Sequence, residues 1–96
     1  MLAVQSPDGR PLALLANYSQ HYYGSGAVSA DYYGRFAEHV AKLVGAANGT
    51  SPFVGIMSQG TSGDQMWMDY GAPRTQIGYD AYAQEVAQRA FEAYGK

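Results

Sequence analysis

Two polar clusters in the 96-residue sequence could carry chemistry, one at His21 and one at Asp64. His21 is followed directly by Tyr22 and Tyr23. An imidazole can ligate a metal ion or act as a base, because its pKa lies near neutrality. A loop histidine that hydrogen-bonds the backbone is the alternative, since no HxH, HExxH or cysteine pairing accompanies His21.

The second cluster is a small-residue loop that follows an apolar run. It consists of Gly60, Thr61, Ser62, Gly63 and Asp64. Small residues let backbone N–H groups approach a ligand, so the loop could bind a substrate or an anion. It lacks the lysine of a P-loop and has the wrong spacing for a nucleophile elbow. Asp64 is the carboxylate that could take part in catalysis, and an ordinary exit from a strand is the alternative.

Periodicity and turn signals predict five elements around these clusters. Two strands joined by Pro7-Asp8-Gly9 form a hairpin, because Pro presets φ and Gly supplies a positive φ. The predicted elements are strands 2–5, 12–18 and 53–58 and helices 29–47 and 79–94.

The first helix carries the clearest end signals. Ser29 is the expected N-cap, and Asp31 in the first turn complements the helix dipole, a role more typical than catalysis. Asn48-Gly49 is expected to end the helix. On the polar face, His39 is expected to be solvated.

The order of elements predicts the fold class and places the two clusters together. Strand 12–18, helix 29–47 and strand 53–58 form a right-handed β-α-β crossover with parallel strands. Their carboxyl ends then share one edge of the sheet, so we expect His21 and Asp64 to lie near each other. The predicted fold is α/β: a β-hairpin and then β-α-β-α, a small mainly parallel sheet with helices packed on it.

Composition excludes several partners and sites. The net charge is −2 with six Lys and Arg residues, so there is no basic stripe for a nucleic acid. The absence of cysteine excludes disulfides and thiolate metal sites. No apolar run approaches about 18 residues, so no integral membrane segment is expected. No signal peptide is visible in the sequence.

Three blocks in order resemble the N-terminal domain of the neutral/alkaline non-lysosomal ceramidases, closest to bacterial ceramidase-like proteins of unknown substrate. They are LANYSQH at 15–21, VSADYYG at 28–34 and FVGIMSQGTSGD at 53–64. The resemblance covers about residues 12–70. It implies a zinc-dependent amidohydrolase that cleaves the N-acyl bond of ceramide, a reaction of sphingolipid metabolism.

The resemblance also implies roles for individual residues. His21 falls on a zinc ligand of the family, while the other ligands lie in parts of a longer chain. Tyr22, Tyr23 and Asp31 would shape the rim or support the metal site. The family's proposed catalytic serine aligns with Met66, so that role does not transfer to this chain.

Because members of the family are much longer, residues 1–96 are expected to form one partial α/β domain that is inactive in isolation. The implied partner is a lipid-like amide substrate, and an exposed sheet edge could support self-association. The family is often secreted or periplasmic. The alternative function is a non-catalytic α/β binding module with a tyrosine-rich rim.

Overall fold

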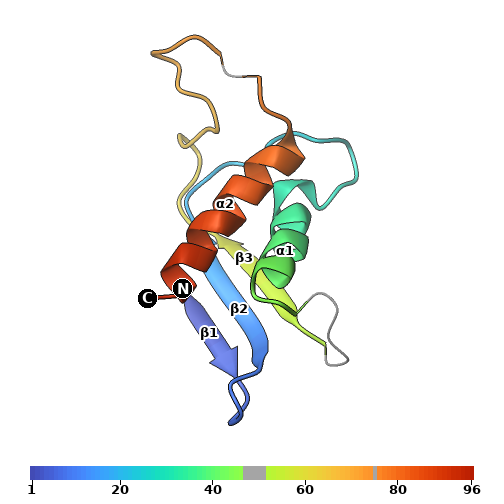
Figure 1. Cartoon of the computed structure of the whole chain (residues 1–96). Coiled ribbons are helices and arrows are strands. Elements are labelled where there is room, and N and C mark those ends of the chain that lie inside the picture. Colours follow the sequence, from blue (N-terminus) through green and yellow to red (C-terminus); the bar gives the residue numbers. More distant parts are fainter. Residues whose placement is uncertain (47–51, 75) are drawn as a thin grey trace.

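A computed structural model describes residues 1–46, 52–74 and 76–96 of the chain. In order, the elements are β1 (Leu2–Gln5), β2 (Pro11–Tyr18), α1 (Asp31–Leu43), β3 (Val54–Gln59) and α2 (Tyr79–Tyr94) (Figure 1). The protein is therefore a mixed α/β chain with a three-stranded sheet and two helices in its described part, as the sequence predicts. No helix in these ranges is long and apolar enough to cross a membrane.

The sheet has the order β1-β2-β3, with β2 in the centre. β1 runs antiparallel to β2 through a tight turn in which Gly9 has a φ of 84°. β2 pairs with β3 in parallel, with Leu14 beside Gly55. One pair of strands is thus antiparallel and one parallel, so the prediction of a mainly parallel sheet is not confirmed.

Both helices pack on the same face of the sheet (Figure 1). The glycine at position 55 lets α1 approach β3 closely. A Cβ at Gly55 would lie 2.9 Å from Val40 Cγ1 and 3.2 Å from Ala37 Cα. The buried core between the layers consists of Leu14, Tyr32, Phe36, Val40, Met57, Ala83 and Ala87.

The first helix is shorter than the predicted span of 29–47. Its N-cap is Ala30 rather than Ser29, and Asp31, the first residue of the helix, takes a left-handed backbone with a φ of 49°. Ser29 Oγ instead accepts a hydrogen bond from the backbone N–H of Asp31 at 2.9 Å. The helix ends before Gly45, whose φ is 76°. The predicted end signal at Asn48-Gly49 lies outside the described residues.

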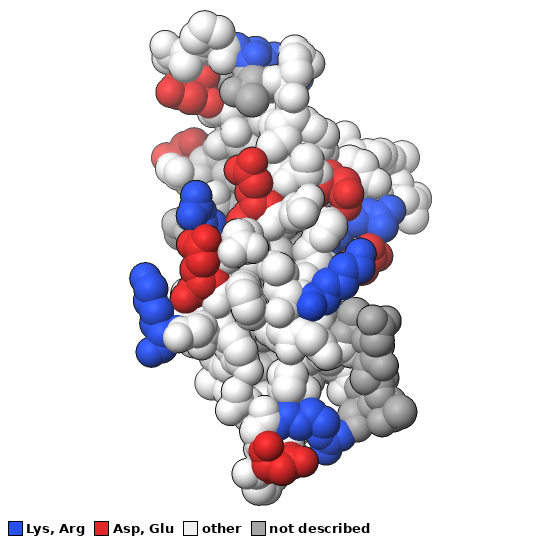
Figure 2. Space-filling model, in the orientation of Figure 1, with Lys and Arg blue, Asp and Glu red and all other residues white. Residues whose placement is uncertain are grey.

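Charged groups of both signs are interspersed on the helix side of the molecule, which Figure 2 shows in the orientation of Figure 1. In this view neither acidic nor basic side chains gather into one continuous patch. The two polar clusters noted in the sequence, at His21 and Asp64, lie at one end of the sheet, where the loops after β2 and β3 begin.

Candidate functional site at the carboxyl edge of the sheet

The loops that follow β2 and β3 lie side by side. The last register pair of the two parallel strands joins Tyr18 to Gln59. Beyond it, the backbone N–H of Gly60 donates to the Tyr18 carbonyl at 3.0 Å, and that of His21 donates to the Gln65 carbonyl at 2.8 Å. The expected meeting of the two loops is therefore present in the backbone. We call this edge, formed by residues 19–25 and 60–67, the rim.

The side chains of His21 and Asp64 do not form a pair within the described structure. His21 is half-buried, its ring centroid lies 4.4 Å from that of Tyr22, and its Nδ1 lies 3.4 Å from the Tyr22 carbonyl oxygen. Asp64 is exposed, and its carboxylate accepts a long hydrogen bond from Gln65 Nε2 at 3.5 Å. The two clusters share the rim without sharing a hydrogen bond or ion pair.

The described residues do not complete a metal site. A catalytic zinc ion takes three protein ligands, from histidine, carboxylate or thiolate groups. Residues 1–46, 52–74 and 76–96 contain no group of three or more such side chains that could hold a metal ion. Within these residues His21 therefore has no set of companion ligands for a metal ion.

Sequence reasoning missed Gln20, which is the buried polar centre of the rim with 4% exposure. Its carbonyl accepts hydrogen bonds from the hydroxyls of Tyr32 at 3.3 Å and Tyr33 at 3.2 Å, and from Gln59 Nε2 at 3.2 Å. These donors come from α1 and from the end of β3. Gln20, which follows β2, thus links the end of that strand to α1 and to β3, immediately before His21.

The side-chain amide of Gln20 holds the second segment of the rim, residues 60–67. In the orientation that pairs both of its ends, its nitrogen donates to the Met66 carbonyl at 3.2 Å and its oxygen accepts from the Trp67 N–H at 2.5 Å. A buried amide with both ends paired is stabilising, whereas an unpaired one is costly. No short motif signals such a role, because its partners are backbone groups 46 and 47 residues away.

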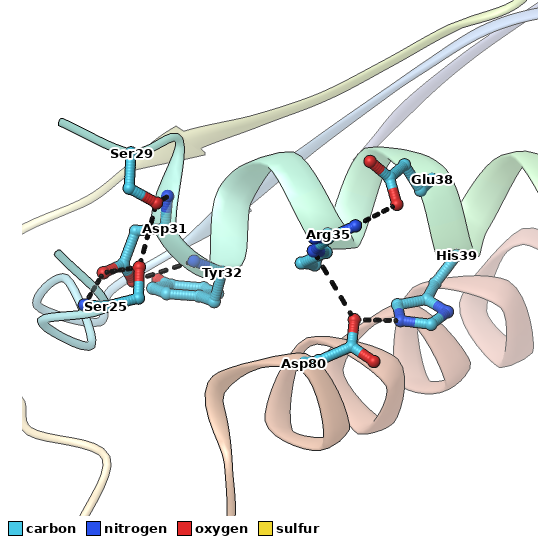
Figure 3. Close-up of polar contacts among 8 residues, drawn as sticks. All are labelled: Ser25, Ser29, Asp31, Tyr32, Arg35, Glu38, His39 and Asp80. Atoms are coloured by element: carbon cyan, nitrogen blue, oxygen red, sulfur yellow. Dashed lines mark hydrogen bonds and ion pairs between the residues drawn. The ribbon is translucent and has the colours of Figure 1, made fainter.

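Asp31 organises the loop between β2 and α1 (Figure 3). Its Oδ1 accepts the backbone N–H groups of Tyr23 at 2.7 Å and Tyr32 at 2.8 Å. Its Oδ2 accepts those of Gly24 and Ser25, each at 2.8 Å, and the Ser25 hydroxyl at 3.1 Å. The carboxylate therefore accepts hydrogen bonds from four backbone N–H groups and fixes Tyr23 on the rim.

The same contacts set the ionisation of Asp31. Partial burial disfavours the charged form, but the backbone N–H groups of Ser25, Tyr32, Tyr23 and Gly24 outweigh it and lower the pKa of Asp31 to about 2. The carboxylate is thus negatively charged at neutral pH. The predicted role of Asp31 at the helix start is correct in part, since it accepts the N–H of the first turn and also orders the preceding loop.

Most tyrosines near the rim pack inward. The Tyr23 ring stacks on Trp67 with centroids 4.5 Å apart, and its hydroxyl donates to the Ile77 carbonyl. The hydroxyls of Tyr18 and Tyr82 lie 3.2 Å apart, and burial raises the pKa of Tyr82. Tyr22, in contrast, is 57% exposed.

The loop from Gly60 to Asp64 is held by its own contacts. Gln59 Nε2 donates to Ser62 Oγ at 2.5 Å, and the Gln65 N–H donates to the Ser62 carbonyl at 3.1 Å. Thr61, Gly63 and Asp64 are exposed, while Gly60 and Ser62 are half-buried. The loop thus presents a carboxylate and a hydroxyl to solvent beside His21.

His39 is not the solvated residue that its helix face suggests. Its Nε2 lies 3.0 Å from Asp80 Oδ1, and its side chain is only 16% exposed. Arg35 Nε lies 3.8 Å from the same oxygen, while Arg35 also pairs with Glu38 at 2.8 Å (Figure 3). This cluster joins α1 to α2.

Comparison with known proteins adds no relative. No protein-family model, no curated protein and no solved structure matches the chain.

Proposed function

We propose that this chain is part of a ceramidase-like amidohydrolase and supplies one wall of its active site. The observation that supports the proposal is the rim, where His21 is bonded through its backbone to the loop that follows β3. The resemblance of the blocks at 15–21, 28–34 and 53–64 to the ceramidases gives the reaction class. The substrate class is a lipid-like N-acyl amide.

In this proposal His21 is one ligand of a zinc ion whose other ligands belong to further parts of a longer chain. Tyr22 and the exposed residues of the loop from Gly60 to Asp64 contact substrate. Asp31 and Tyr23 position these groups, since Asp31 orders the loop that carries both tyrosines. No reaction step is assigned to Asp64. With one available metal ligand, the 96-residue chain alone should be inactive.

The proposal also extends to the fold of the longer protein and to the compartment in which that protein acts. The β-α-β unit would be the beginning of a larger, mainly parallel sheet whose remaining strands come from outside residues 1–96. The longer protein would be secreted or periplasmic, as ceramidases often are.

The test compares the 96-residue chain with the protein encoded by the full reading frame that contains it. Metal content is measured after dialysis, and fatty acid release is measured on an N-acyl sphingosine. We expect zinc and turnover only in the longer protein, and loss of both in its His21→Ala variant. His39→Ala is the matched control, because His39 lies between the helices and should leave zinc content unchanged.

A complete reading frame without further histidine, glutamate and tyrosine ligands would contradict the proposal. It would favour the second candidate function, a non-catalytic binding module. The observation behind that candidate is the exposure of three tyrosines, Tyr18 at 38%, Tyr22 at 57% and Tyr70 at 75%. Exposed tyrosines are frequent in binding surfaces because a ring and a hydroxyl act together.

A further inference from the structure

A cavity of about 260 Å³ lies between the second half of α2 and the sheet. Its floor is formed by Phe36 of α1 and Met57 of β3, both buried, and its walls include Ala16 of β2 and Ala90 of α2. Ala16 faces the helices because it lies two residues after the buried Leu14. Both wall residues have only a methyl side chain, so the space between helix and sheet, which close packing normally fills, stays partly open.

The cavity is separate from the rim and has the size of a small apolar ligand. None of its lining residues in the described part of the chain belongs to 19–25 or 60–67. An apolar cavity of about 150 Å³ can bind benzene, so one of about 260 Å³ has room for about ten carbon atoms. Pockets that bind small ligands are mostly apolar, with a few polar groups that fix the orientation of the ligand. The cavity therefore fits one alkyl chain or ring system of about eight to ten carbons.

Arg89 carries the charge at the opening of the cavity. Its side chain is the charged one among the lining residues that the structure describes, and it is 79% exposed. Its hydrogen bonds to Glu92 both leave from Nη1, at 3.1 and 3.4 Å. A guanidinium has five N–H donors, so others remain for an anionic head group. Glu92 does not line the cavity, and a ligand at the opening therefore meets a positive charge.

We infer that the cavity binds a small amphipathic anion, with its apolar body between α2 and the sheet and its carboxylate or phosphate head beside Arg89. Such a ligand leaves both its head group and the ion pair of Arg89 with Glu92 in water. A protein segment laid over the opening would instead bury that ion pair, which costs free energy unless new hydrogen bonds replace the water. The exposed charges thus favour a small ligand over a segment of a longer chain. The inference is independent of the proposed function, because it concerns a different site.

The test titrates the ¹⁵N-labelled 96-residue chain with octanoate and with octyl phosphate and follows the amide chemical shifts. We expect saturable shifts at Ala16, Met57 and Ala90, with a dissociation constant on the order of 1 mM for a ligand of this size. The anion that binds more tightly identifies the preferred head group. Ala90→Leu extends a branched side chain into the cavity and should weaken both anions by about tenfold or more. Ala81→Leu is the matched control, because Ala81 is an exposed residue of the same helix.

A second variant, Arg89→Gln, tests the charge at the opening. It should weaken octanoate by about 2–5-fold, because it removes the guanidinium beside the head group, and leave the binding of uncharged 1-octanol unchanged. Lys42→Gln is its control, because Lys42 is an exposed cation on the other helix. Circular dichroism checks that each variant folds.

The absence of saturable shifts at about 10 mM octanoate would overturn the inference. So would octanoate binding that persists at full strength in folded Ala90→Leu, since it would take place elsewhere on the chain. Octanoate binding that Arg89→Gln leaves unchanged would overturn it as well, because the head group would then not lie beside the guanidinium.

Discussion

Asp31 offers a quantitative test of how the rim is held together. The substitution Asp31→Asn keeps a side chain that tolerates the left-handed backbone, where φ is 49°, and one oxygen acceptor. It removes the charge and one of the two acceptor oxygens that receive the N–H groups of Tyr23, Gly24, Ser25 and Tyr32.

The magnitude follows from the ionisation of the carboxyl. Its pKa falls from 3.8 to about 2, because the four backbone donors outweigh partial burial. At about 1.36 kcal/mol per pKa unit, this fall in pKa corresponds to about 2.4 kcal/mol of stability if the carboxyl is shielded from water. Asp31 is only half-buried, so solvent screening reduces the contribution to the unfolding free energy to about 1–1.5 kcal/mol.

The sign of the pH dependence is fixed by the direction of the shift. A carboxyl with a lowered pKa in the folded state contributes its full stabilisation above about pH 4. That contribution is lost as the pH falls from about 4 to about 2. Asp31→Asn should therefore be less stable than wild type by about 1–1.5 kcal/mol at pH 6, and the difference should close near pH 2.

Urea unfolding at pH 6, 4, 3 and 2, followed by circular dichroism, measures this difference. Asp64→Asn is the control, because the Asp64 carboxylate is exposed and makes one long hydrogen bond, at 3.5 Å. It should change the unfolding free energy by less than about 0.5 kcal/mol. A difference in unfolding free energy between wild type and Asp31→Asn that is equally large at pH 2 and pH 6 would refute the reasoning.

Four further substitutions test the packing and the polar contacts. Gly55→Ala should destabilise by about 1–3 kcal/mol in urea unfolding, because its Cβ would lie 2.9 Å from a side chain of α1. Gly63→Ala, with open space around it, should change stability by less than about 0.5 kcal/mol, and equal effects would contradict this account. Gln20→Ala should cost about 1–3 kcal/mol by leaving the backbone carbonyl of Met66 and the N–H of Trp67, both in half-buried residues, without this partner, and a Tm within 1 °C of wild type would argue against it. His39→Gln should cost no more than about 1 kcal/mol, since Asp80 is exposed.

Local signals in the sequence were sufficient for much of the fold. Pro7-Asp8-Gly9 predicts the hairpin, and Gly9 does adopt a positive φ. The predicted strands 2–5, 12–18 and 53–58 agree with β1, β2 and β3 to within one residue at each end, and helix 79–94 agrees with α2. Each of these elements has a period within its own span or a turn signal directly beside it.

Features that depend on distant partners were not predictable in this way. The start of α1 is set by the Asp31 carboxylate, which receives N–H groups from a loop up to eight residues earlier. Gln20 looks like one polar loop residue among several, although its partners make it the buried centre of the rim. The proximity of the loops after β2 and β3 was predictable, because it follows from the β-α-β connection. The orientation of the His21 and Asp64 side chains was not, because loop contacts set it.

The measurement that most directly tests the shared rim is amide exchange and NOE spectroscopy on the ¹⁵N-labelled chain. The His21 N–H donates to the Gln65 carbonyl at 2.8 Å, so we predict a slowly exchanging His21 amide with cross-peaks to Gln65 and Met66. A His21 amide that exchanges at the rate of an unstructured peptide, with no cross-peak to residues 64–67, would contradict the account.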